Sequence, residues 1–263
     1  MNTQHEINER SKPLYMAEMI WEDYISSINS GAVILIPCGA LEQHGSHLPL
    51  KTDAFIAECF AGRVALETNS IVAPTFTYGN KSQALSGGGQ IFPGTTSLAP
   101  HTLSLMVKDV LRELFRHGAK KILLINGHGE NSFPLFEGVD MAIENLGSSD
   151  VKVVVSGWWQ FVNNDHIENI FPGDFPGWDL EHAATTETSL MLSFDPNSVR
   201  SDRIVDETMD YIPPYTVFPQ PVDLVPKSGL MSKAKPASRN IGDKLIAVAM
   251  EGFRELISRE FSC

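Results

Sequence analysis

Apolar residues along the chain follow two patterns, which alternate through most of the sequence. Short continuous apolar runs, typical of strands buried on both faces of a sheet, occur at residues 32–37, 71–74, 121–125 and 151–155. Longer segments with apolar residues every three or four positions predict helices at residues 52–67, 101–117, 133–146, 182–192 and 241–261. This alternation predicts a three-layer α/β/α sandwich, in which helices cover both faces of a mostly parallel sheet.

Length and composition favour one domain. The chain has 263 residues, of which 43% are hydrophobic, and we expect them to form a single domain over residues 1–263. The proline-rich segment 212–226 (IPPYTVFPQPVDLVP) is predicted to be extended and irregular. Because only one predicted helix follows it, we interpret this segment as an arm on the surface or at a subunit contact.

Charge and hydropathy disfavour two classes of partner. A formal net charge of −12 repels the phosphates of nucleic acids. No apolar run approaches the roughly 18 residues that span a bilayer, and residues 1–16 lack the basic and apolar regions of a signal peptide. We therefore expect a cytoplasmic protein that acts on small molecules and binds neither nucleic acid nor membrane. The three cysteines include no CxxC pair, so no disulfide framework is predicted.

Two of the predicted strands end in similar groups of polar residues and glycines. The first is followed by GALEQHGSH, with Glu42 and His44, and a later one by NGHGEN, with His128 and Glu130. In extended backbone, residues two positions apart point to the same side, so each pair is expected to converge on one point. Both pairs, and Asp53 at the start of the next helix, would lie beyond the carboxyl ends of the strands, where ligands bind.

These five residues are predicted to bind metal. One such pair alone would have little meaning, but two pairs and an aspartate at one edge favour a site. Carboxylates and imidazoles suit Zn²⁺ or Mn²⁺, and five of them suit two ions about 3.5–4 Å apart. His47 is expected to line the cleft or to hydrogen-bond a ligand. Cys38 is expected to be a small buried residue, the alternative being a nucleophile with His44 as its base.

Two further stretches are candidates for substrate contacts. Residues 175–192 hold four polar or aromatic candidates ahead of an apolar helix: Trp178, Asp179, Glu181 and His182. Glu187, on the same helix, is a further residue that could face the metals. The alternative is that Asp179 caps the helix while Trp178 belongs to the core. Residues 86–97 are rich in glycine but lack the GK[ST] ending of a P-loop, which favours a loop against a small ligand.

Four segments resemble the creatininase (creatinine amidohydrolase) family: GALEQHGSHLPLKTD, SGGGQIFPGTTSL, NGHGEN and WDLEHAATTETSLML. The resemblance extends from Trp21 to the last predicted helix. It implies a three-layer α/β fold, assembly as a homohexamer, and two divalent cations, Zn²⁺ and/or Mn²⁺, as cofactors. It also implies how the ligands are divided: Glu42 and His128 for one ion, His44 and Glu130 for the other, and Asp53 between them.

The resemblance also assigns substrate contacts. Ser86 falls where family members contact substrate, Trp159 where a mobile tryptophan covers the ligand, and Trp178 is expected to stack on a flat substrate. Gly129 stands where creatininase has an aromatic residue, which removes one wall of the pocket. Either the pair Trp158-Trp159 compensates for this loss, or the pocket admits a bulkier ring.

The activity that the resemblance implies is hydrolysis of a cyclic amide by a metal-activated hydroxide, with creatinine to creatine as the leading expectation. His182 is expected to carry a proton to the leaving nitrogen, and Glu130 is a second catalytic candidate. Asp179 and Glu181 are expected to orient His182 or to bind a guanidinium-like edge. One alternative is a family hydrolase for another ring or a formamide, such as an inosose-like cyclic ketone or a formamidopyrimidine. Another is a metal-dependent binding protein without turnover.

Overall fold

A parallel sheet forms the centre of the computed structural model, which describes residues 12–144, 146, 150–171, 175–209, 211 and 213–261. Within these residues the sheet has four strands: β1 (Val33–Cys38), β2 (Ser70–Val72), β3 (Lys121–Asn126) and β4 (Lys152–Gly157). Their order is β2-β1-β3-β4 and all neighbours are parallel, with Leu35 opposite both Val72 and Leu123. The predicted parallel sheet is confirmed.

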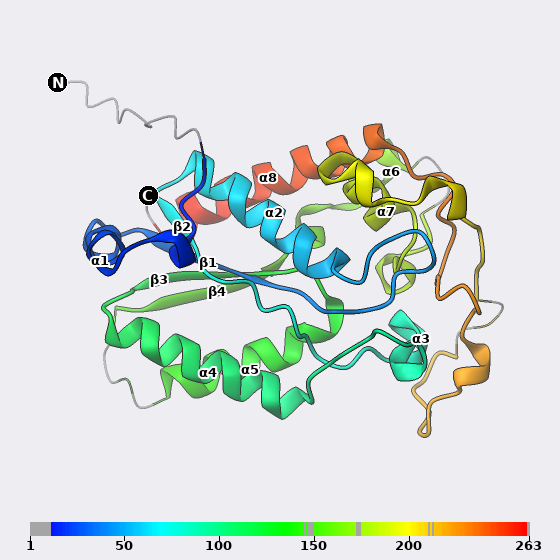
Figure 1. Cartoon of the computed structure of the whole chain (residues 1–263), viewed down its shortest axis with the longest axis horizontal. Coiled ribbons are helices and arrows are strands. Elements are labelled where there is room, and N and C mark those ends of the chain that lie inside the picture. Colours follow the sequence, from blue (N-terminus) through cyan, green and yellow to red (C-terminus); the bar gives the residue numbers. More distant parts are fainter. Residues whose placement is uncertain are drawn as a thin grey trace.

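Helices cover both faces of this sheet (Figure 1). One face carries α2 (Thr52–Glu67), α7 (Thr185–Phe194) and α8 (Arg239–Phe261), and the other carries α4 (Pro100–Arg116) and α5 (Ser132–Ile143). Successive residues of a strand point to opposite faces. Accordingly, Leu35 packs in the core with α2, α7 and α8, while Ile36 packs in the core with α4 and α5. The three-layer α/β/α sandwich predicted from the hydrophobic pattern is therefore confirmed.

The long elements have close to their predicted boundaries. α2 occupies the predicted residues 52–67, and Gly118, with a positive φ of 91°, follows the end of α4. The helix predicted at residues 133–146 is α5, and residues 145 and 147–149 lie outside the described part of the chain. Three shorter helices were not predicted: α1 (Trp21–Asn29), α3 (Ala84–Gly87) and α6 (Asn164–Ile170).

The helix predicted at residues 182–192 begins later, at Thr185, so Glu181 and His182 belong to the loop before α7. That boundary was wrong because Ala183 has a positive φ of 53°, which a helix does not accommodate. The Glu181 carboxylate accepts hydrogen bonds from the backbone N–H and the hydroxyl of Thr186, at 2.9 and 2.6 Å. It thereby pairs a helix donor that would otherwise lack a partner. Glu181 thus caps α7, a role that the sequence had suggested for Asp179.

The proline-rich arm lies on the surface beside the glycine-rich segment. Its described residues, 213–226, are irregular apart from a short 3₁₀ helix at Val222–Leu224, and Ile212 lies outside the described residues. Gln220 accepts a hydrogen bond of 2.6 Å from the backbone N–H of Ala84, at the start of α3. The irregular character is as predicted, and the arm reaches the segment that was expected to contact substrate.

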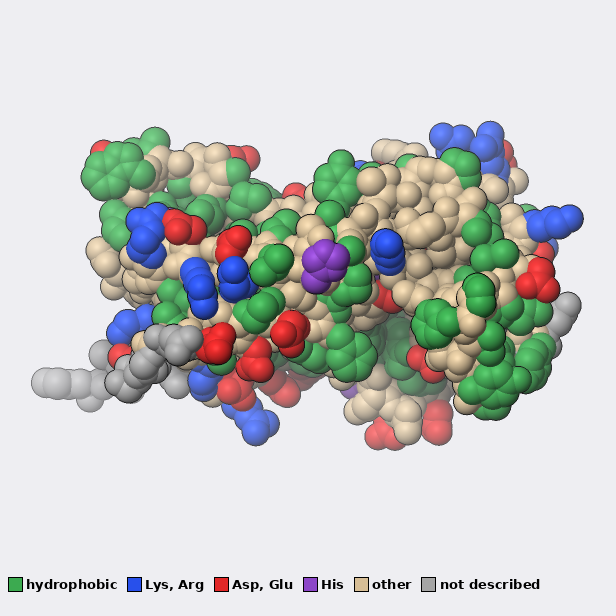
Figure 2. Space-filling view, turned by 90° about the horizontal axis from the view of Figure 1, so that it is seen from below, with side chains coloured by type: hydrophobic (Ala, Val, Ile, Leu, Met, Phe, Trp, Pro, Cys, Tyr) green, Lys and Arg blue, Asp and Glu red, His purple; other side chains and the backbone are tan. Residues whose placement is uncertain are grey.

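The outer face of the α4–α5 layer mixes charged and hydrophobic side chains (Figure 2). Its exposed hydrophobic residues include Leu105 of α4 and Phe133 and Phe136 of α5. Across the described residues, none of the helices combines the length and apolar character that crossing a membrane would require.

Candidate active site

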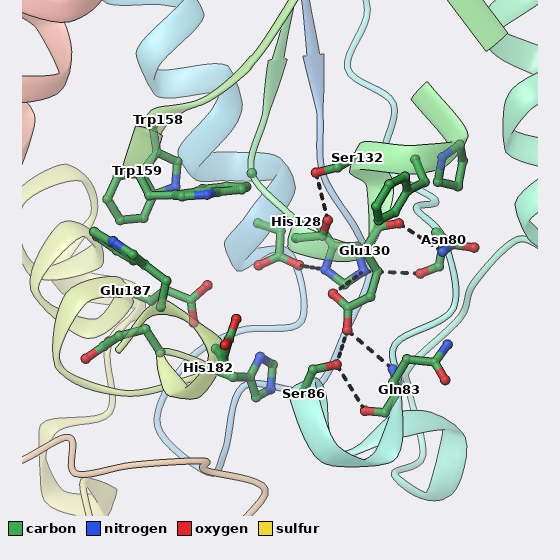
Figure 3. A pocket seen from close by; sticks show the side chains of 18 of the residues that line it. Asn80, Gln83, Ser86, His128, Glu130, Ser132, Trp158, Trp159, His182 and Glu187 are labelled. Atoms are coloured by element: carbon green, nitrogen blue, oxygen red, sulfur yellow. Dashed lines mark hydrogen bonds and ion pairs between the residues drawn. The ribbon is translucent and has the colours of Figure 1, made fainter. Parts of the chain in front are cut away.

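The carboxyl ends of β1 and β3 face a cavity of about 610 Å³ (Figure 3). This is the edge of the sheet where ligands of parallel α/β folds bind. The cavity lining combines the exits of β3 and β4 with the loop before α7 and with α7 itself, and it includes Asp53, His128, Glu130, Trp178, His182 and Glu187. The topology therefore gathers most of the predicted site residues around one space.

Two glycines let the strand exits approach the first turn of α2. A Cβ atom on Gly39 would lie 2.2 Å from the backbone nitrogen of Ala54, and one on Gly127 would lie 2.4 Å from the carbonyl oxygen of Asp53. Both distances are too short for any side chain, so only glycine permits this packing. The first turn of α2 thereby holds Asp53 between the two strand exits.

Asp53 is shared by two groups of buried side chains. Its Oδ2 is 3.1 Å from Nδ1 of His128, and the same nitrogen is 3.2 Å from Oε2 of Glu42. Its Oδ1 is 2.8 Å from Nε2 of His44, and this nitrogen is 3.5 Å from Oε2 of Glu187. Each group therefore offers two carboxylates and one imidazole, with the ligand atoms of a group within 4.8 Å of one another.

The donor atoms of these two groups fit a cation. Glu42 Oε1, His44 Nε2 and Asp53 Oδ2 are buried and make no hydrogen bond of acceptable geometry, although the last two lie at ion-pair distances from their neighbours. Buried polar atoms normally have a bonding partner, and bound divalent cations would provide a partner for each of these three atoms. Carboxylate and imidazole donors are those that Zn²⁺ and Mn²⁺ accept.

Electrostatics at the site also favours cations. Burial alone would lower the pKa of His44 and of His128, but the adjacent carboxylates raise both pKa values well above their usual range. Burial would raise the pKa of Asp53, but the two imidazoles hold it below its ordinary value. Asp53 is thus ionised, whereas burial raises the pKa of Glu42, and a cation bound beside Asp53 can replace the imidazole protons.

Glu130 lies on another side of the His128 ring. Its Oε2 is 3.5 Å from Nε2 of His128, whereas Glu42 and Asp53 approach Nδ1. Its Oε1 accepts hydrogen bonds from the hydroxyl of Ser86 and from the backbone of Gln83. Figure 3 shows Glu130 directed toward Ser86 at the floor of the cavity. The predicted substrate contact Ser86 is therefore tied to a predicted metal ligand.

The structure brings together Glu42, Asp53 and His128 as the family resemblance implies, but it does not bring Glu130 to His44. The reason is local, because the residues after His128 form a short 3₁₀ helix rather than extended backbone. Glu187 lies beside His44 instead. A hydrogen bond of 2.7 Å from the backbone N–H of Ala183 holds the Glu187 carboxylate in that position.

Glu181 and His182 point to different parts of the structure. Glu181 is buried at the start of α7, and burial raises its pKa to about 8. The His182 ring lies with its centroid 4.5 Å from that of His44, and its Nε2 is 2.9 Å from Nε2 of Gln43. The hydrogen bond that orients His182 therefore involves Gln43, which the sequence reasoning missed. Asp179 is exposed and lines the cavity.

Tryptophans form one wall of the cavity. Trp158 meets Trp159 and Trp178 edge to face, with ring centroids 5.9 and 5.7 Å apart. Figure 3 shows Trp158 and Trp159 across the cavity from Glu130 and Ser86. Gly129 also lines the cavity, and a Cβ atom there would meet nothing within 4 Å. The space beside Gly129 is therefore open.

Two residues near the site have structural roles. Nε2 of His47 hydrogen-bonds the hydroxyl of Thr188 at 2.9 Å, which links the β1 exit to α7. Burial lowers the pKa of His47 to about 4, so this ring is neutral.

The Cys38 thiol is buried, donates to the carbonyl oxygen of Ile36, and has a pKa raised by burial. A buried thiol of this kind is a poor nucleophile, which supports the interpretation of Cys38 as a packing residue.

Comparison with known proteins identifies relatives along nearly the whole chain. A family model described as creatinine amidohydrolase matches residues 17–257. The chain is 43% identical to the creatinine amidohydrolase of Pseudomonas putida over 256 residues, which are 95% of this chain and 98% of that protein. It is 30% identical over 237 residues to a mycofactocin precursor peptide peptidase of Mycolicibacterium smegmatis, covering 86% of this chain and 85% of that protein.

Solved structures match the fold closely. A manganese form of creatininase has a TM-score of 0.92 at 42% sequence identity, covering 96% of this chain and 100% of that chain. Creatininase variants solved in a zinc–zinc form and in complex with creatine have the same TM-score of 0.92. The sandwich and the arrangement of its layers are thus shared with these proteins.

The buried Glu181 predicts a pH dependence of stability. Its carboxyl is protonated in the folded protein up to a pKa of about 8 but has an ordinary pKa of 4.5 when unfolded. Between pH 4.5 and about pH 8 the folded protein therefore holds a proton on Glu181 that the unfolded chain has lost. The stability from this proton is fully present below pH 4.5 and is lost as the pH rises toward 8. Relative to Glu181→Gln, the free energy of unfolding of the wild type should fall by about 1 kcal/mol per pH unit.

Urea denaturation of both proteins after chelation, from about pH 5 to pH 8, measures this difference. The Gln side chain is a matched control because it keeps the shape and cannot ionise. Parallel curves for the two proteins would show that Glu181 does not hold a proton in the folded state.

Proposed function

Because this chain belongs to the creatininase family, we propose that it is a hydrolase of amide C–N bonds that opens the ring of creatinine to give creatine. The observation that carries the proposal is the pair of buried carboxylate–imidazole groups sharing Asp53 beside a tryptophan-lined cavity. The relative from Pseudomonas putida, 43% identical and named for this activity, supports the same reaction.

We propose two divalent cations, Zn²⁺ and/or Mn²⁺, as cofactors, a proposal supported by the zinc and manganese forms of the solved relatives. Glu42, Asp53 and His128 would hold one ion, and Asp53 and His44 would take part in holding the other. When bound, a pair of cations lowers the pKa of a water molecule and polarises a carbonyl group.

The walls of the cavity suit a flat, cationic or guanidinium-like substrate. Trp159 and Trp178 present ring faces and edges that can enclose a planar ring and exclude water. Carboxylates also line the cavity, among them Asp179 and Glu187, and they can pair with the N–H edge of a guanidinium.

Two side chains of the cavity can assist departure of the ring nitrogen, which must gain a proton as the C–N bond breaks. His182 lines the cavity and its ring lies close to His44. Glu130 lines the cavity as well, and the Ser86 hydroxyl donates to its carboxylate. Both residues line the space that a bound substrate would occupy.

A second candidate function is hydrolysis of a bulkier amide. The observation that favours it is the open space beside Gly129 in a cavity of about 610 Å³, a size that accommodates ligands larger than one small ring. The 30% identical relative from Mycolicibacterium smegmatis is named as a peptidase of a precursor peptide, and a peptide is a larger amide substrate than creatinine. Separate from this is the alternative of a family hydrolase for a different ring or a formamide, such as an inosose-like cyclic ketone or a formamidopyrimidine.

We also propose, from the family resemblance, that the protein assembles as a homohexamer in the cytoplasm. The exposed Phe133 and Phe136 on α5 provide apolar surface for a subunit contact. Light scattering of the purified protein measures the assembly, and a monomer at all concentrations would contradict it.

The shared position of Asp53 predicts how metal content responds to substitution. Asp53→Asn should lose both ions, because each group depends on one of its carboxylate oxygens, whereas Glu42→Gln should lose about one. Metal analysis after gel filtration measures the ratio of ions to protein. Equal losses in the two variants would contradict the sharing of Asp53.

The same measurement identifies the third ligand beside His44. Glu187→Gln tests the carboxylate that lies 3.5 Å from His44 in the structure, and Glu130→Gln tests the one implied by the family resemblance. If Glu187→Gln loses more metal than Glu130→Gln, Glu187 is the third ligand. If Glu130→Gln loses more, the ligand is Glu130.

His182 is predicted to act in turnover rather than in metal binding. His182→Ala should lower kcat for creatinine by about 10²–10⁴-fold, because it removes a group placed to hydrogen-bond or protonate the reacting atoms. Metal content should stay at the wild-type value. Normal turnover in this variant would exclude a catalytic role for His182.

A substrate panel decides between the two candidate functions. Rapid formation of creatine from creatinine is expected, and peptides, formamides and cyclic polyol ketones should react more slowly. Gly129→Tyr should reduce activity toward bulky amides more than toward creatinine, because the new ring fills the open space. Preference for a bulky amide would favour the second function, and tight binding without turnover of any compound would contradict both.

A further inference from the structure

We propose that Gln220, on the proline-rich arm, is a positioning residue for substrate binding, because it fixes the start of α3 and thereby the cavity wall that carries Ser86. The arm and α3 lie side by side at one end of the molecule (Figure 1). The proposal rests on the proposed function for the part that Ser86 plays in binding, whereas the contact between the arm and α3 is independent of the substrate.

α3 is too short to keep its position without help from the rest of the chain. It has four residues, Ala84–Gly87, which make about one turn. One isolated turn is unstable in water, because a single hydrogen bond does not offset the backbone freedom that is lost. The place of α3 in the cavity wall therefore depends on its contacts with distant segments.

The side-chain amide of Gln220 provides such a contact at the first residue of α3. Its Oε1 accepts a hydrogen bond of 2.6 Å from the backbone N–H of Ala84, a buried residue whose N–H is one of the donors that a helix start leaves unpaired. Its Nε2 donates to Oε1 of Gln83, the residue before the helix. Both ends of one amide are thus used to hold the start of α3.

Apolar packing holds the arm against the same turn. Val225, near the end of the arm, is buried with Ala84 and Met231 in a small cluster that is separate from the two large cores. Phe92 and Leu180 pack against this cluster. Because apolar contacts have little directionality, the packing brings the arm and α3 together, while the hydrogen bonds of the amide set the orientation of the turn.

The other side of α3 faces the cavity. Ser86 and Gln83 line the cavity, and both donate to Oε1 of Glu130, Ser86 from its hydroxyl and Gln83 from its backbone N–H at 3.4 Å (Figure 3). A Cβ atom on Gly87 would lie 2.1 Å from Oε1 of Glu42. α3 is therefore packed closely between the arm and the site, and a shift of its first turn would move Ser86.

Loss of the Gln220 amide is expected to weaken substrate binding more than catalysis. Without the amide, the buried N–H of Ala84 lacks its partner, so the first turn of α3 can open or tilt. The substrate must then order this wall when it binds, which raises KM. Glu130 keeps its contact of 3.5 Å with His128, so kcat should change little.

Steady-state kinetics of Gln220→Met measures this effect. Met keeps the length of the side chain and removes both hydrogen bonds, so KM for creatinine should rise about 5–20-fold while kcat stays within about threefold. Gln220→Glu keeps an oxygen for the N–H of Ala84 and should restore most of the binding. Asp223→Asn is the control, because this exposed residue of the arm takes no part in the hydrogen bonds to α3, and its KM should equal that of the wild type. An unchanged KM in Gln220→Met would overturn the proposal.

A double-mutant cycle shows whether Gln220 acts through Ser86. In the Ser86→Ala background, Gln220→Met should raise KM by less than about twofold further, because the group that it positions is already absent. A general loss of stability would act alike in both backgrounds. Equal effects of Gln220→Met with and without Ser86 would therefore contradict the positioning role.

Amide hydrogen exchange tests the contact without any substrate. In the full-length protein loaded with Zn²⁺, the N–H of Ala84 should exchange slowly in the wild type and about 10–100-fold faster in Gln220→Met, while exchange in β1 should stay unchanged. Rapid exchange of the Ala84 N–H in the wild type would overturn the proposal, even if Gln220→Met does not fold.

The two kinds of measurement separate this proposal from the proposed function. If the wild type does not turn over creatinine, the proposed function fails, and the exchange of the Ala84 N–H still decides whether Gln220 holds α3. If creatinine is turned over but exchange and KM are both unaffected in Gln220→Met, the positioning role alone is wrong.

Discussion

The two oxygens of the Asp53 carboxylate hold the site together, because one lies 2.8 Å from His44 and the other 3.1 Å from His128. This contact joins two strand exits that are far apart in the sequence. It requires the first turn of α2 to press against both exits, and Gly39 and Gly127 make that approach possible. The parallel sheet fixes where the two exits begin, and the contacts with Asp53 then set the relative positions of the two imidazoles.

Sequence periodicity was sufficient for the layers and for the position of the site, because buried strands and amphipathic helices have distinct repeats. It was not sufficient for the direction of individual side chains. Glu130 turns away from His44 since a 3₁₀ helix follows His128, and Glu181 caps α7 instead of orienting His182. Gln43 lies between two predicted ligands, and the sequence carried no prediction for it. Its hydrogen bonds depend on three backbone groups that only the folded chain brings together.

Family membership and substrate choice have different structural origins in this chain. The buried carboxylates and imidazoles supply a site for divalent cations, and relatives named for different activities match the same chain. In the proposed function, substrate choice depends instead on the cavity wall, where tryptophans enclose one side and Gly129 leaves space on another. Chemistry located on a rigid sheet edge and selectivity located on variable walls are a common arrangement in α/β enzymes.

The most direct test of this account is anomalous diffraction from crystals of the full-length protein loaded with Zn²⁺. The account predicts two anomalous peaks, one on each side of the Asp53 carboxylate, with His44 bound to one ion and His128 to the other. Their separation should be about 3.5–4 Å, as for other paired sites. A single peak, or peaks that Asp53 does not contact, would contradict the central claim.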